Sequence, residues 1–323
     1  MKNKKVLDIK NLKVEYKVEK KIINALNGLD LEIYEGETLG LVGETGAGKT
    51  TTAMSIMQLI PSPPGKIVKG SINFVGEDLM KVSESRKREI RGNEISMIFQ
   101  DPMTALNPRM TVGEQIEEVI SYHRKVSSKQ ARKEAERMLE IVGIKKERAI
   151  SYPHQFSGGM KQRVVIAIAL ACQPKLLIAD EPTTALDVTI QAQMLKMIQE
   201  LKIEYKTSVL MITHDLGVVA RTCDKVAIMY AGEVVEYGTL KAIFKQTKHP
   251  YTKGLFDSIP SISSQVNRLS PIMGEAPDPS NLPVGCKFSP RCSRCQDICV
   301  KEDPKVTINS EYHQFRCHFP LNK

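Results

Sequence analysis

Hydrophobic residues in the first hundred positions gather in short segments whose composition is typical of β-strands. The expected strands cover residues 6–9, 12–16, 29–33, 39–42, 71–74 and 95–99. The strand at 39–42 is apolar throughout and runs directly into a glycine-rich turn. Residues 50–59 then predict a helix, because a Pro-Ser-Pro-Pro-Gly stretch beginning at Pro61 stops the helical pattern.

Helical spacing of apolar residues dominates the next part of the chain. Residues 112–142, 160–171 and 188–205 predict helices. The segments 176–179 and 208–212 are apolar and predict buried strands of a parallel sheet. Strands that alternate with helices in this way favour an α/β core, and the long helical stretch indicates an insertion into it.

The chain changes character after about residue 248. Prolines and serines are frequent between residues 258 and 290. This composition predicts a loop-rich extension at the C-terminal end and not a second globular core.

Composition narrows the class of protein without deciding it. With 41% hydrophobic residues the chain can bury a sizeable core. Its net charge of +9 arises from 46 basic and 37 acidic residues, a moderately basic surface and not a nucleic-acid-binding tail. The longest apolar run, Val164–Cys172, is far shorter than the ~20 residues of a membrane-spanning helix. The N-terminus lacks the apolar stretch of a signal peptide, so we expect a cytosolic protein with free or metal-bound cysteines.

A phosphate-binding loop follows the apolar strand at 39–42. The run Gly43-Glu44-Thr45-Gly46-Ala47-Gly48-Lys49-Thr50 fits the pattern G-x-x-x-x-G-K-[ST] in full. Its glycines let backbone N–H groups converge on phosphate oxygens, and the helix behind it presents its positive end. Lys49 supplies a charge for the β- and γ-phosphates, and Thr50 offers a hydroxyl to Mg²⁺. The loop indicates nucleoside triphosphate binding but does not select a reaction.

A pair of acidic residues ends the apolar strand that begins at Leu176. Asp180 is placed at the strand tip, where its carboxylate can hold Mg²⁺ through water. Glu181 follows it and is suited to act as a general base on the attacking water. Together with the upstream loop, this pair predicts nucleotide hydrolysis.

The run Ser157-Gly158-Gly159-Met160-Lys161-Gln162-Arg163 resembles the signature sequence of ABC-type ATPases. Phe156 and Met160 depart mildly from the usual pattern, while the Ser-Gly-Gly at the start of the helix is intact. The residues around it match the family's other motifs in the family's order. Gln100 resembles the Q-loop glutamine, His214 the switch histidine, and Ala185-Leu186-Asp187 the D-loop.

The resemblance implies the fold: a RecA-like P-loop ATPase core of α/β type, a small antiparallel β subdomain and a helical subdomain at about residues 101–165. We expect an ATPase domain over residues 1–257 and a cysteine-containing extension over residues 258–323. The expected catalytic residues are Glu181, His214 and Gln100. The expected Mg²⁺ ligands are Thr50, Gln100 and Asp180. The expected ATP contacts are Tyr16, Gly43, Glu44, Thr45, Gly46, Ala47, Gly48, Lys49, Thr50, Thr51, Ser157, Gly158, Gly159 and Asp187. Tyr16 stands where the family places an aromatic against adenine, and a core tyrosine in a strand is the alternative.

The resemblance also implies partners. Two ATP-binding subunits of this family face each other head to tail, so that each Ser157-type signature meets the γ-phosphate held by the other subunit. The implied partner is a sister ATP-binding subunit or a second copy of this chain. No membrane helix is fused to the ATPase, which favours an importer with two separate permease subunits and an extracytoplasmic substrate-binding protein. The chain would then lie at the cytoplasmic face of the membrane, and no nucleic acid is expected as a partner.

Residues 100–108, Gln-Asp-Pro-Met-Thr-Ala-Leu-Asn-Pro, closely resemble the Q-loop region of oligopeptide, dipeptide and nickel importers. The runs beginning at His249, Gly274 and Cys286 are similar to the C-terminal part of the same subfamily. The implied function is ATP-driven import of oligopeptides or dipeptides, with import of nickel or another small solute as the alternative. A metal or redox sensor that binds ATP as a ligand is a rival hypothesis, which the hydrolytic residues Glu181 and His214 argue against.

Five of the seven cysteines lie in the C-terminal part of the chain. Four cysteines can hold Zn²⁺ or a [4Fe–4S] cluster, and neither their spacing nor the ligand type decides between the two. Some members of the resembled subfamily hold an iron–sulfur cluster here, at the positions of Cys286, Cys292, Cys299 and Cys317. Cys295 departs from the family pattern and is a spare thiol or an alternative ligand. Free cysteines in a loop-rich tail are the remaining possibility.

Overall fold

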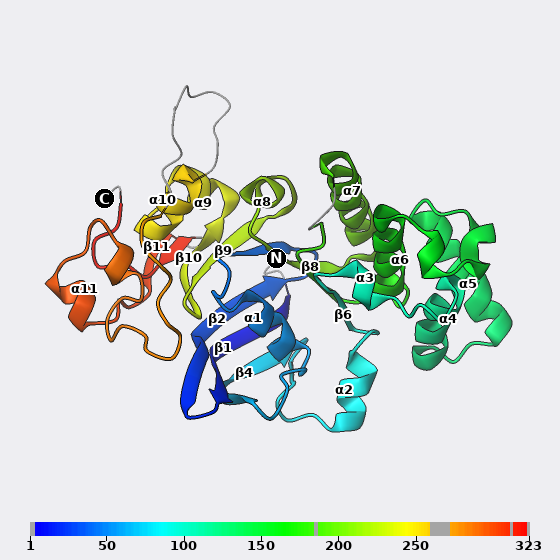
Figure 1. The fold of residues 1–323 in the computed structure, drawn as a ribbon, viewed down its shortest axis with the longest axis horizontal. Coiled ribbons are helices and arrows are strands. Elements are labelled where there is room, and N and C mark those ends of the chain that lie inside the picture. Colours follow the sequence, from blue (N-terminus) through cyan, green and yellow to red (C-terminus); the bar gives the residue numbers. More distant parts are fainter. Residues whose placement is uncertain (1–3, 184–186, 259–271, 311–312, 322–323) are drawn as a thin grey trace. The chain divides into compact units, whose positions relative to one another are not determined.

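The computed structural model describes residues 4–183, 187–258, 272–310 and 313–321 (Figure 1). The chain divides into two compact units, each assembled from several stretches. The first unit comprises residues 1–6, 33–38 and 74–213, and the second comprises residues 7–32, 39–73 and 214–323. Segments that are distant in sequence therefore pack together within each unit.

The first unit is built on three parallel strands, β6 (Ile95–Ile98), β7 (Leu176–Asp180) and β8 (Ser208–Thr213), which lie side by side in that order. Every residue of the three strands is buried. Strands buried on both faces read as continuous apolar runs, which is why the sequence pattern located them. A short strand, β5 (Glu77–Asp78), belongs to the same unit.

Helices make up most of the rest of the first unit. They are α2 (Glu84–Ile90), α3 (Pro102–Ala105), α4 (Val112–His123), α5 (Ser128–Ile141), α6 (Gly158–Leu170) and α7 (Val188–Tyr205), with short 3₁₀ turns η1 (Lys146–Ile150) and η2 (Pro153–Gln155). The helices α4, α5 and α6 pack against one another (Figure 1). The single helical stretch expected at 112–142 is two helices, because α4 and α5 each begin with a capping box, at Thr111 and at Ser127.

Two sets of strands shape the second unit. In one, β2 (Lys21–Tyr34), β1 (Lys5–Val18) and β4 (Gly65–Phe74) lie side by side. In the other, the order is β11 (Thr307–Ser310), β12 (His313–Phe315), β10 (Glu233–Thr239), β9 (Lys225–Tyr230) and β3 (Thr38–Val42). The strands β3 and β9 are parallel, whereas the other neighbours in this set are antiparallel.

Short helices accompany these strands: α1 (Lys49–Ile56), α8 (Leu216–Thr222), α9 (Leu240–Lys245), α10 (Pro250–Asp257) and α11 (Asp297–Lys301), with a 3₁₀ turn η3 (Ser289–Arg291). The strand β12, near the C-terminal end of the chain, pairs with β10. Glu236 of β10 and His313 of β12, both buried, are 2.8 Å apart between Oε1 and Nε2. This buried polar contact fixes the register of the added strand.

The structure confirms most of the expected core elements, but besides dividing the helical stretch it joins two expected strands. The segments expected at 6–9 and 12–16 form a single strand, β1, with no turn between them. Asn11 lies at their junction with φ 47°, a conformation that asparagine tolerates, and its N–H donates to Asp30 Oδ1 at 2.8 Å. Helix α7 has the bounds that the sequence predicts. The strands β9 and β10 were missed.

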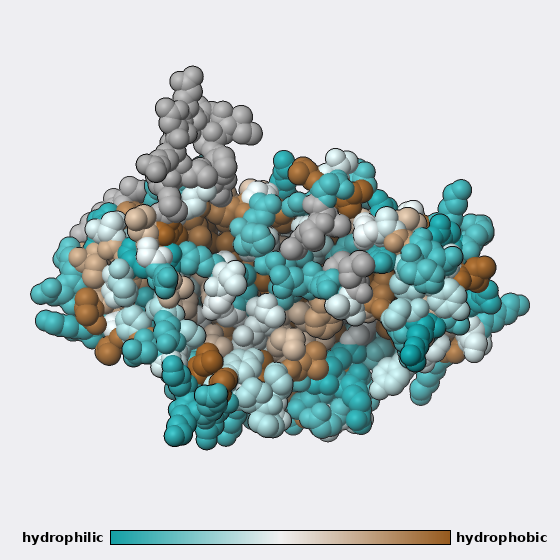
Figure 2. Space-filling model, in the orientation of Figure 1, coloured by the Kyte–Doolittle hydropathy of each residue, from teal (hydrophilic) through white to brown (hydrophobic). Residues whose placement is uncertain are grey.

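Within the described part of the chain, no helix is long and apolar enough to cross a membrane. On the face drawn in Figure 2, polar and charged residues cover most of the surface, and apolar residues form small separate groups. The apolar side chains are instead gathered in the strands described above, where Leu39, Ile178 and Leu210 are among the fully buried residues.

Candidate functional site

The phosphate loop begins where the buried strand β3 ends, in the second unit. Gly43 has no room for a side chain, because a Cβ atom there would lie 2.2 Å from the carbonyl oxygen of Met229. Gly48 has φ 102°, and its Cβ would lie 2.7 Å from the carbonyl oxygen of Ala25. Only glycine meets both demands, so these positions explain the fixed glycines of the motif.

Helix α1 starts directly after this loop. Its N-cap is Gly48, no side chain caps its first turn, and no acidic residue lies there. The first backbone N–H groups of a helix have no partner within the helix, and they carry its partial positive charge. The end of α1 is therefore suited to receive phosphate oxygens.

Lys49 lies over the phosphate loop. Its side chain is buried, and Nζ donates to the carbonyl oxygens of Gly43 at 2.7 Å and Glu44 at 3.0 Å. A buried ammonium group is stable only with such partners. Thr45, Gly46 and Thr50 are exposed along the same loop, Ala47 is buried, and Thr51 is half-buried on α1.

Tyr16 lies on β1 and is half-buried. A Cβ atom on Gly65 would lie 2.7 Å from Cε1 of this tyrosine, so the ring packs closely against the backbone of Gly65. The ring is partly accessible, as adenine stacking requires. Its contact with adenine remains a prediction.

The acidic pair lies at the end of β7 in the first unit. Asp180 is buried at 2% exposure, and Glu181 follows it with φ 48°. The N–H of Glu181 donates to the carbonyl oxygen of Ile212 at 2.9 Å, which extends the pairing of β7 with β8 by one residue. The left-handed backbone at Glu181 then turns the chain away from the sheet.

Gln100 lies two residues beyond the end of β6, beside the acidic pair. Its Nε2 donates to Glu181 Oε2 at 3.0 Å, so the structure brings together two of the three expected catalytic residues. The amide and the carboxylate are far apart in sequence, and adjacent parallel strands deliver both to the same edge of the sheet. An amide donor orients this carboxylate without removing its ability to accept a proton from water.

The Ser157-Gly158-Gly159 run forms the start of α6 in the first unit. Ser157 is its N-cap, and Oγ accepts from the N–H of Met160 at 3.4 Å. Gly158 is exposed, and a Cβ atom there would meet nothing within 4 Å. Gln162 on the same helix is buried and donates from Nε2 to the carbonyl oxygen of Pro182 at 2.6 Å. The signature helix is therefore tied to the segment that follows the acidic pair.

The remaining nucleotide motifs flank α7 and α8. Asp187 caps α7, and its Oδ1 accepts from the N–H of Ile190 at 2.9 Å. Ala185 and Leu186, which complete the expected D-loop, lie outside the described residues. His214 is exposed, directly after β8, and by the division of the chain it belongs to the second unit with the phosphate loop.

Two residues that sequence reasoning missed contact the phosphate loop. The hydroxyl of Tyr251 on α10 accepts from the N–H of Glu44 at 3.0 Å. The guanidinium of Arg291 on η3 is ion-paired with the Glu44 carboxylate, at 2.7 Å. An acidic residue inside an anion-binding loop was the available signal, since such a charge needs a cation beside it.

Four cysteines of the extension face one small cavity. Cys286, Cys292, Cys299 and Cys317 line it together with Phe288 and Phe319, whereas the exposed Cys295 is not among its lining residues. Burial raises the pKa of the Cys286 thiol to about 12 and that of Cys317 to about 11. Within the described part of the chain, no three His, Cys, Asp or Glu side chains converge as ligands of a single metal ion.

His249 lines the same cavity. Burial lowers its pKa to about 4, so the ring is neutral at physiological pH. Its Nδ1 accepts from the N–H of Tyr251 at 3.1 Å, which leaves the proton on Nε2. That buried Nε2 has no hydrogen-bond partner among the described residues. A donor beside four sulfurs matches the surroundings of a sulfur-ligated centre.

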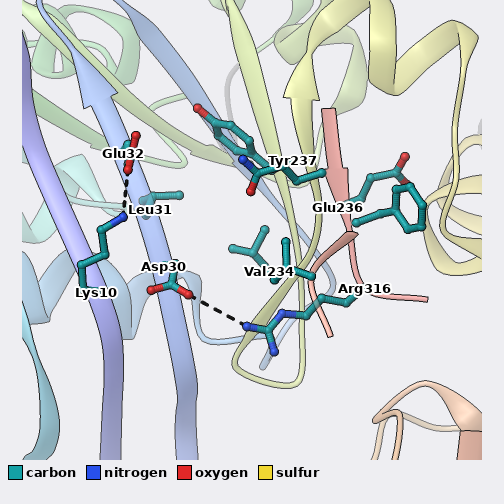
Figure 3. Close-up of a pocket in the computed structure, with 11 residues that line it drawn as sticks. Lys10, Asp30, Leu31, Glu32, Val234, Glu236, Tyr237 and Arg316 are labelled. Carbon is teal, nitrogen blue, oxygen red and sulfur yellow. Dashed lines mark hydrogen bonds and ion pairs between the residues drawn. The ribbon is translucent and has the colours of Figure 1, made fainter. Parts of the chain in front are cut away.

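A different cavity, of about 310 Å³, lies between β2 and the β10–β12 ladder (Figure 3). Its charged residues are already paired: Lys10 Nζ donates to Glu32 at 2.8 Å, and Arg316 Nη2 lies 4.0 Å from Asp30. None of the phosphate loop residues lines it. We therefore do not assign this cavity to the nucleotide.

Comparison with known families gives two matches. Residues 26–184 match the family described as "ABC transporter". Residues 235–299 match "Oligopeptide/dipeptide transporter, C-terminal region", which includes three of the four cavity cysteines.

Similar proteins span nearly the whole chain. Oligopeptide transport ATP-binding protein AppD of Bacillus subtilis is 50% identical over 97% of this chain and 96% of its own length. Dipeptide transport ATP-binding protein DppD of the same bacterium is 50% identical over 97% and 94%. Oligopeptide transport ATP-binding protein OppD of Escherichia coli is 47% identical over 93% and 89%.

Among solved structures, the dimeric ATP-binding cassette MJ0796 in a post-hydrolysis state with ADP and Pi is similar, with a TM-score of 0.66 and 30% identity. The match covers 72% of this chain and 98% of the cassette. Since the cassette is almost fully covered, the part of this chain beyond it is additional to the ATP-binding fold.

Proposed function

This chain belongs to the family of ABC transporter ATPases that carry the oligopeptide/dipeptide transporter C-terminal region, and on that premise we propose that it powers the import of oligopeptides or dipeptides. The observation that carries the ATPase half is the Gln100–Glu181 contact at the end of β7, because a protein that only binds ATP needs no oriented carboxylate there. The observation that carries the peptide half is the similarity to peptide-transport subunits, which continues through the C-terminal extension.

In the proposed reaction, ATP phosphates rest on the amides of the phosphate loop and the start of α1. Lys49 would turn its ammonium to the β- and γ-phosphates, and Thr50, Asp180 and Gln100 are the residues that would hold Mg²⁺. Support comes from the uncapped end of α1 and from Asp180, which is buried at the tip of its strand. Mg²⁺, when bound, neutralises charge on the phosphate oxygens.

Glu181 accepts the proton of the attacking water while the water oxygen bonds to the γ-phosphorus and the bond to ADP breaks. Gln100 orients that carboxylate, and His214 stabilises the charge on the phosphoryl group. The direct contact between Gln100 and Glu181 supports the first of these roles. The position of His214 at the end of β8 supports the second.

We propose that the start of α6 serves the nucleotide of another subunit, either a sister ATP-binding protein or a second copy of this chain. Ser157 and Gly158 are exposed, and a Cβ atom on Gly158 would meet nothing within 4 Å. In this arrangement the γ-phosphate joins two subunits, and its hydrolysis separates them. Asp187 would lie at the same interface.

The membrane partners are two permease subunits and an extracytoplasmic substrate-binding protein, which place the chain at the cytoplasmic face of the membrane. Exposed apolar side chains in the first unit support a docking role: Phe99 beside Gln100, and Ile150 and Tyr152 in the helical part. We also propose a division of the chain into two parts. They are an ATPase domain at 1–257, with its helical part at about 101–165, and an extension at 258–323.

We further propose that Cys286, Cys292, Cys299 and Cys317 hold a [4Fe–4S] cluster, with Zn²⁺ as the alternative. All four line one cavity together with His249, whose buried Nε2 has no hydrogen-bond partner in the described part of the chain. A cluster is larger than a single ion, so its ligands need not converge as closely as zinc ligands do. When bound, the centre would cross-link an extension that has little apolar core.

Elemental analysis of the anaerobically purified chain tests this site. We expect about four irons and four sulfides per chain for the cluster, or about one zinc for the alternative. Cys286→Ser should lower the metal content, and Cys295→Ser should leave it unchanged. A chain with neither iron nor zinc would contradict the proposal.

Transport by the reconstituted complex tests the function. The chain would be assembled with its permease subunits in proteoliposomes, with substrate-binding protein present, and uptake of labelled peptides and of ⁶³Ni²⁺ compared. ATP-dependent peptide uptake that Glu181→Gln abolishes is the expected result. Uptake of nickel without peptide would favour the nickel alternative, and ATP binding without hydrolysis or any membrane partner would favour a sensor.

A further inference from the structure

An arginine of the C-terminal extension is ion-paired with the acidic residue of the phosphate loop. Arg291 Nη1 lies 2.7 Å from Glu44 Oε2, and Nη2 lies 3.2 Å from Oε1. These two parallel contacts form the forked pair that arginine makes with carboxylates. The two residues are 247 positions apart in the sequence. From this contact we propose that Arg291 is a positioning residue of the nucleotide site, through which the extension prepares the phosphate loop for ATP.

Arg291 is held firmly in place. Its side chain is only 6% exposed. Its Nε donates to the carbonyl oxygen of Met273 at 3.2 Å, and Nη1 lies 3.3 Å from the hydroxyl of Tyr230. The guanidinium carbon is 5.8 Å from the centre of the Tyr230 ring, within the range of a cation–π contact. Because Met273 and Tyr230 hold the guanidinium of Arg291, Arg291 can in turn fix the carboxylate of Glu44.

The backbone of Glu44 is held by the same region. Its N–H donates to the Tyr251 hydroxyl at 3.0 Å. The rings of Tyr230, Tyr251 and Phe288 are in mutual contact, with centroids 4.6 to 5.4 Å apart. Phe288 and Arg291 belong to the same short segment of the extension. Both the main chain and the side chain of Glu44 thus depend on groups outside the phosphate loop.

The position of Glu44 also affects Lys49, the lysine proposed to contact the phosphates. The carbonyl oxygen of Glu44 accepts from Lys49 Nζ at 3.0 Å. A displaced Glu44 would therefore disturb Lys49. The charge of Glu44 matters as well, because an unpaired carboxylate in an anion-binding loop repels the phosphates of ATP. Arg291 removes that repulsion by compensating the charge.

This inference rests on the proposed nucleotide site, and it makes a prediction that a purely structural arginine would not. Arg291→Ala should raise the Kd for MgATP about tenfold, because the half-buried Glu44 carboxylate loses its partner and then repels the phosphates. The KM for ATP should rise in parallel, with kcat at saturation changed by less than about threefold. Adding Glu44→Gln to Arg291→Ala should restore most of the affinity, since the repelling charge is then absent.

The experiment is calorimetric titration of MgATP into the purified full chain, combined with ATP turnover of the assembled complex. Arg316→Ala is the matched control, because Arg316 is a partly buried arginine of the same extension that is ion-paired near Asp30, Glu233 and Asp303 and not with the phosphate loop (Figure 3). Its Kd for MgATP should equal that of the wild type.

An unchanged Kd in Arg291→Ala would overturn the inference, as would an equal loss in Arg316→Ala or a failure of Glu44→Gln to restore binding. If Arg291→Ala does not fold, Arg291→Lys keeps the charge and loses the fork, and its Kd should rise about threefold. A wild-type Kd in that variant would overturn the inference. A wild-type chain that binds no MgATP would instead contradict the proposed function.

Discussion

The two helix ends proposed to bind phosphate, at α1 and at α6, are built in opposite ways. The end of α1 has a glycine N-cap and no side-chain cap, and Arg291 and Tyr251 hold Glu44 in the loop before it. The end of α6 carries its own serine cap, and a Cβ atom on Gly158 would meet nothing within 4 Å.

This difference indicates which subunit supplies the remaining groups of each proposed phosphate site. Tyr251 and Arg291 of the same unit contact Glu44 in the loop before α1, and we propose that one chain binds a nucleotide there. The end of α6 is open at Gly158, and we propose that a phosphate of another subunit approaches it there. Changes at α1 should therefore affect nucleotide binding, and changes at α6 should affect turnover without affecting binding.

The largest effect is expected from Lys49→Ala. This variant removes the ammonium that meets the phosphates, so the Kd for MgATP should rise on the order of 100-fold and turnover should disappear. Lys196→Ala is the control, because Lys196 is 77% exposed on α7 and paired only loosely, at 3.7 Å, with Glu200. Tight MgATP binding by Lys49→Ala would contradict the proposal that the nucleotide binds at the start of α1.

Gly158→Asp tests the proposed phosphate site at the start of α6. The open space around Gly158 accepts the side chain, but a carboxylate at the start of α6 repels the phosphate expected there. Turnover should fall about 100-fold while the Kd for MgATP stays within about twofold of the wild type. Gly158→Ala, which adds no charge, should keep most of the activity. A parallel loss of binding and turnover would contradict an open α6 end.

Glu236→Ala tests whether Glu236 of β10 anchors β12 and the segment at Lys248 and His249. The Glu236 carboxylate is fully buried and accepts from the N–H groups of Lys248 and His249 at 2.7 and 2.9 Å, besides contacting His313. Losing it should lower the free energy of unfolding by about 3 kcal/mol. Glu236→Gln keeps an acceptor and should lose about 1 kcal/mol. Chemical denaturation followed by circular dichroism measures both, and equal stabilities would contradict this anchoring role.

The smallest effect concerns pH. Burial raises the pKa of Glu233, at the start of β10, to about 7, with Asp303 adding to the shift. Because the folded state binds this proton more tightly than the unfolded state, the stabilisation is complete below the ordinary pKa near 4.5 and is lost as pH rises through about 7. Denaturation at pH 5 and pH 8 should show a stability difference on the order of 2 kcal/mol that Glu233→Gln removes. An identical pH dependence in the variant would contradict this assignment.

Sequence reasoning located the parts of the site that local chemistry determines. Three of these parts are short contiguous runs whose residue types indicate a function: the strand at 39–42, the loop that follows it, and the acidic pair at Asp180. The start of α6 was identified by the resemblance of its Ser-Gly-Gly run to the signature of ABC-type ATPases, and its role as an anion site stays a prediction.

Contacts between distant residues could not be predicted in the same way. The pairing of Arg291 with Glu44 depends on how η3 packs beside the phosphate loop. The sequence of neither segment indicates that the two residues are in contact. The strands β9 and β10 were missed, although β9 is almost wholly buried. The capping boxes at Thr111 and Ser127 were readable, and they would have divided the helical stretch correctly.

We propose that this chain hydrolyses ATP with Glu181 as the general base. The direct test is to compare wild type and Glu181→Gln in MgATP binding and in ATP turnover. We predict a Kd within about twofold of the wild type and a turnover reduced by about 100- to 10,000-fold, since the amide keeps the contact with Gln100 but takes no proton from water. Wild-type turnover in Glu181→Gln would contradict the account.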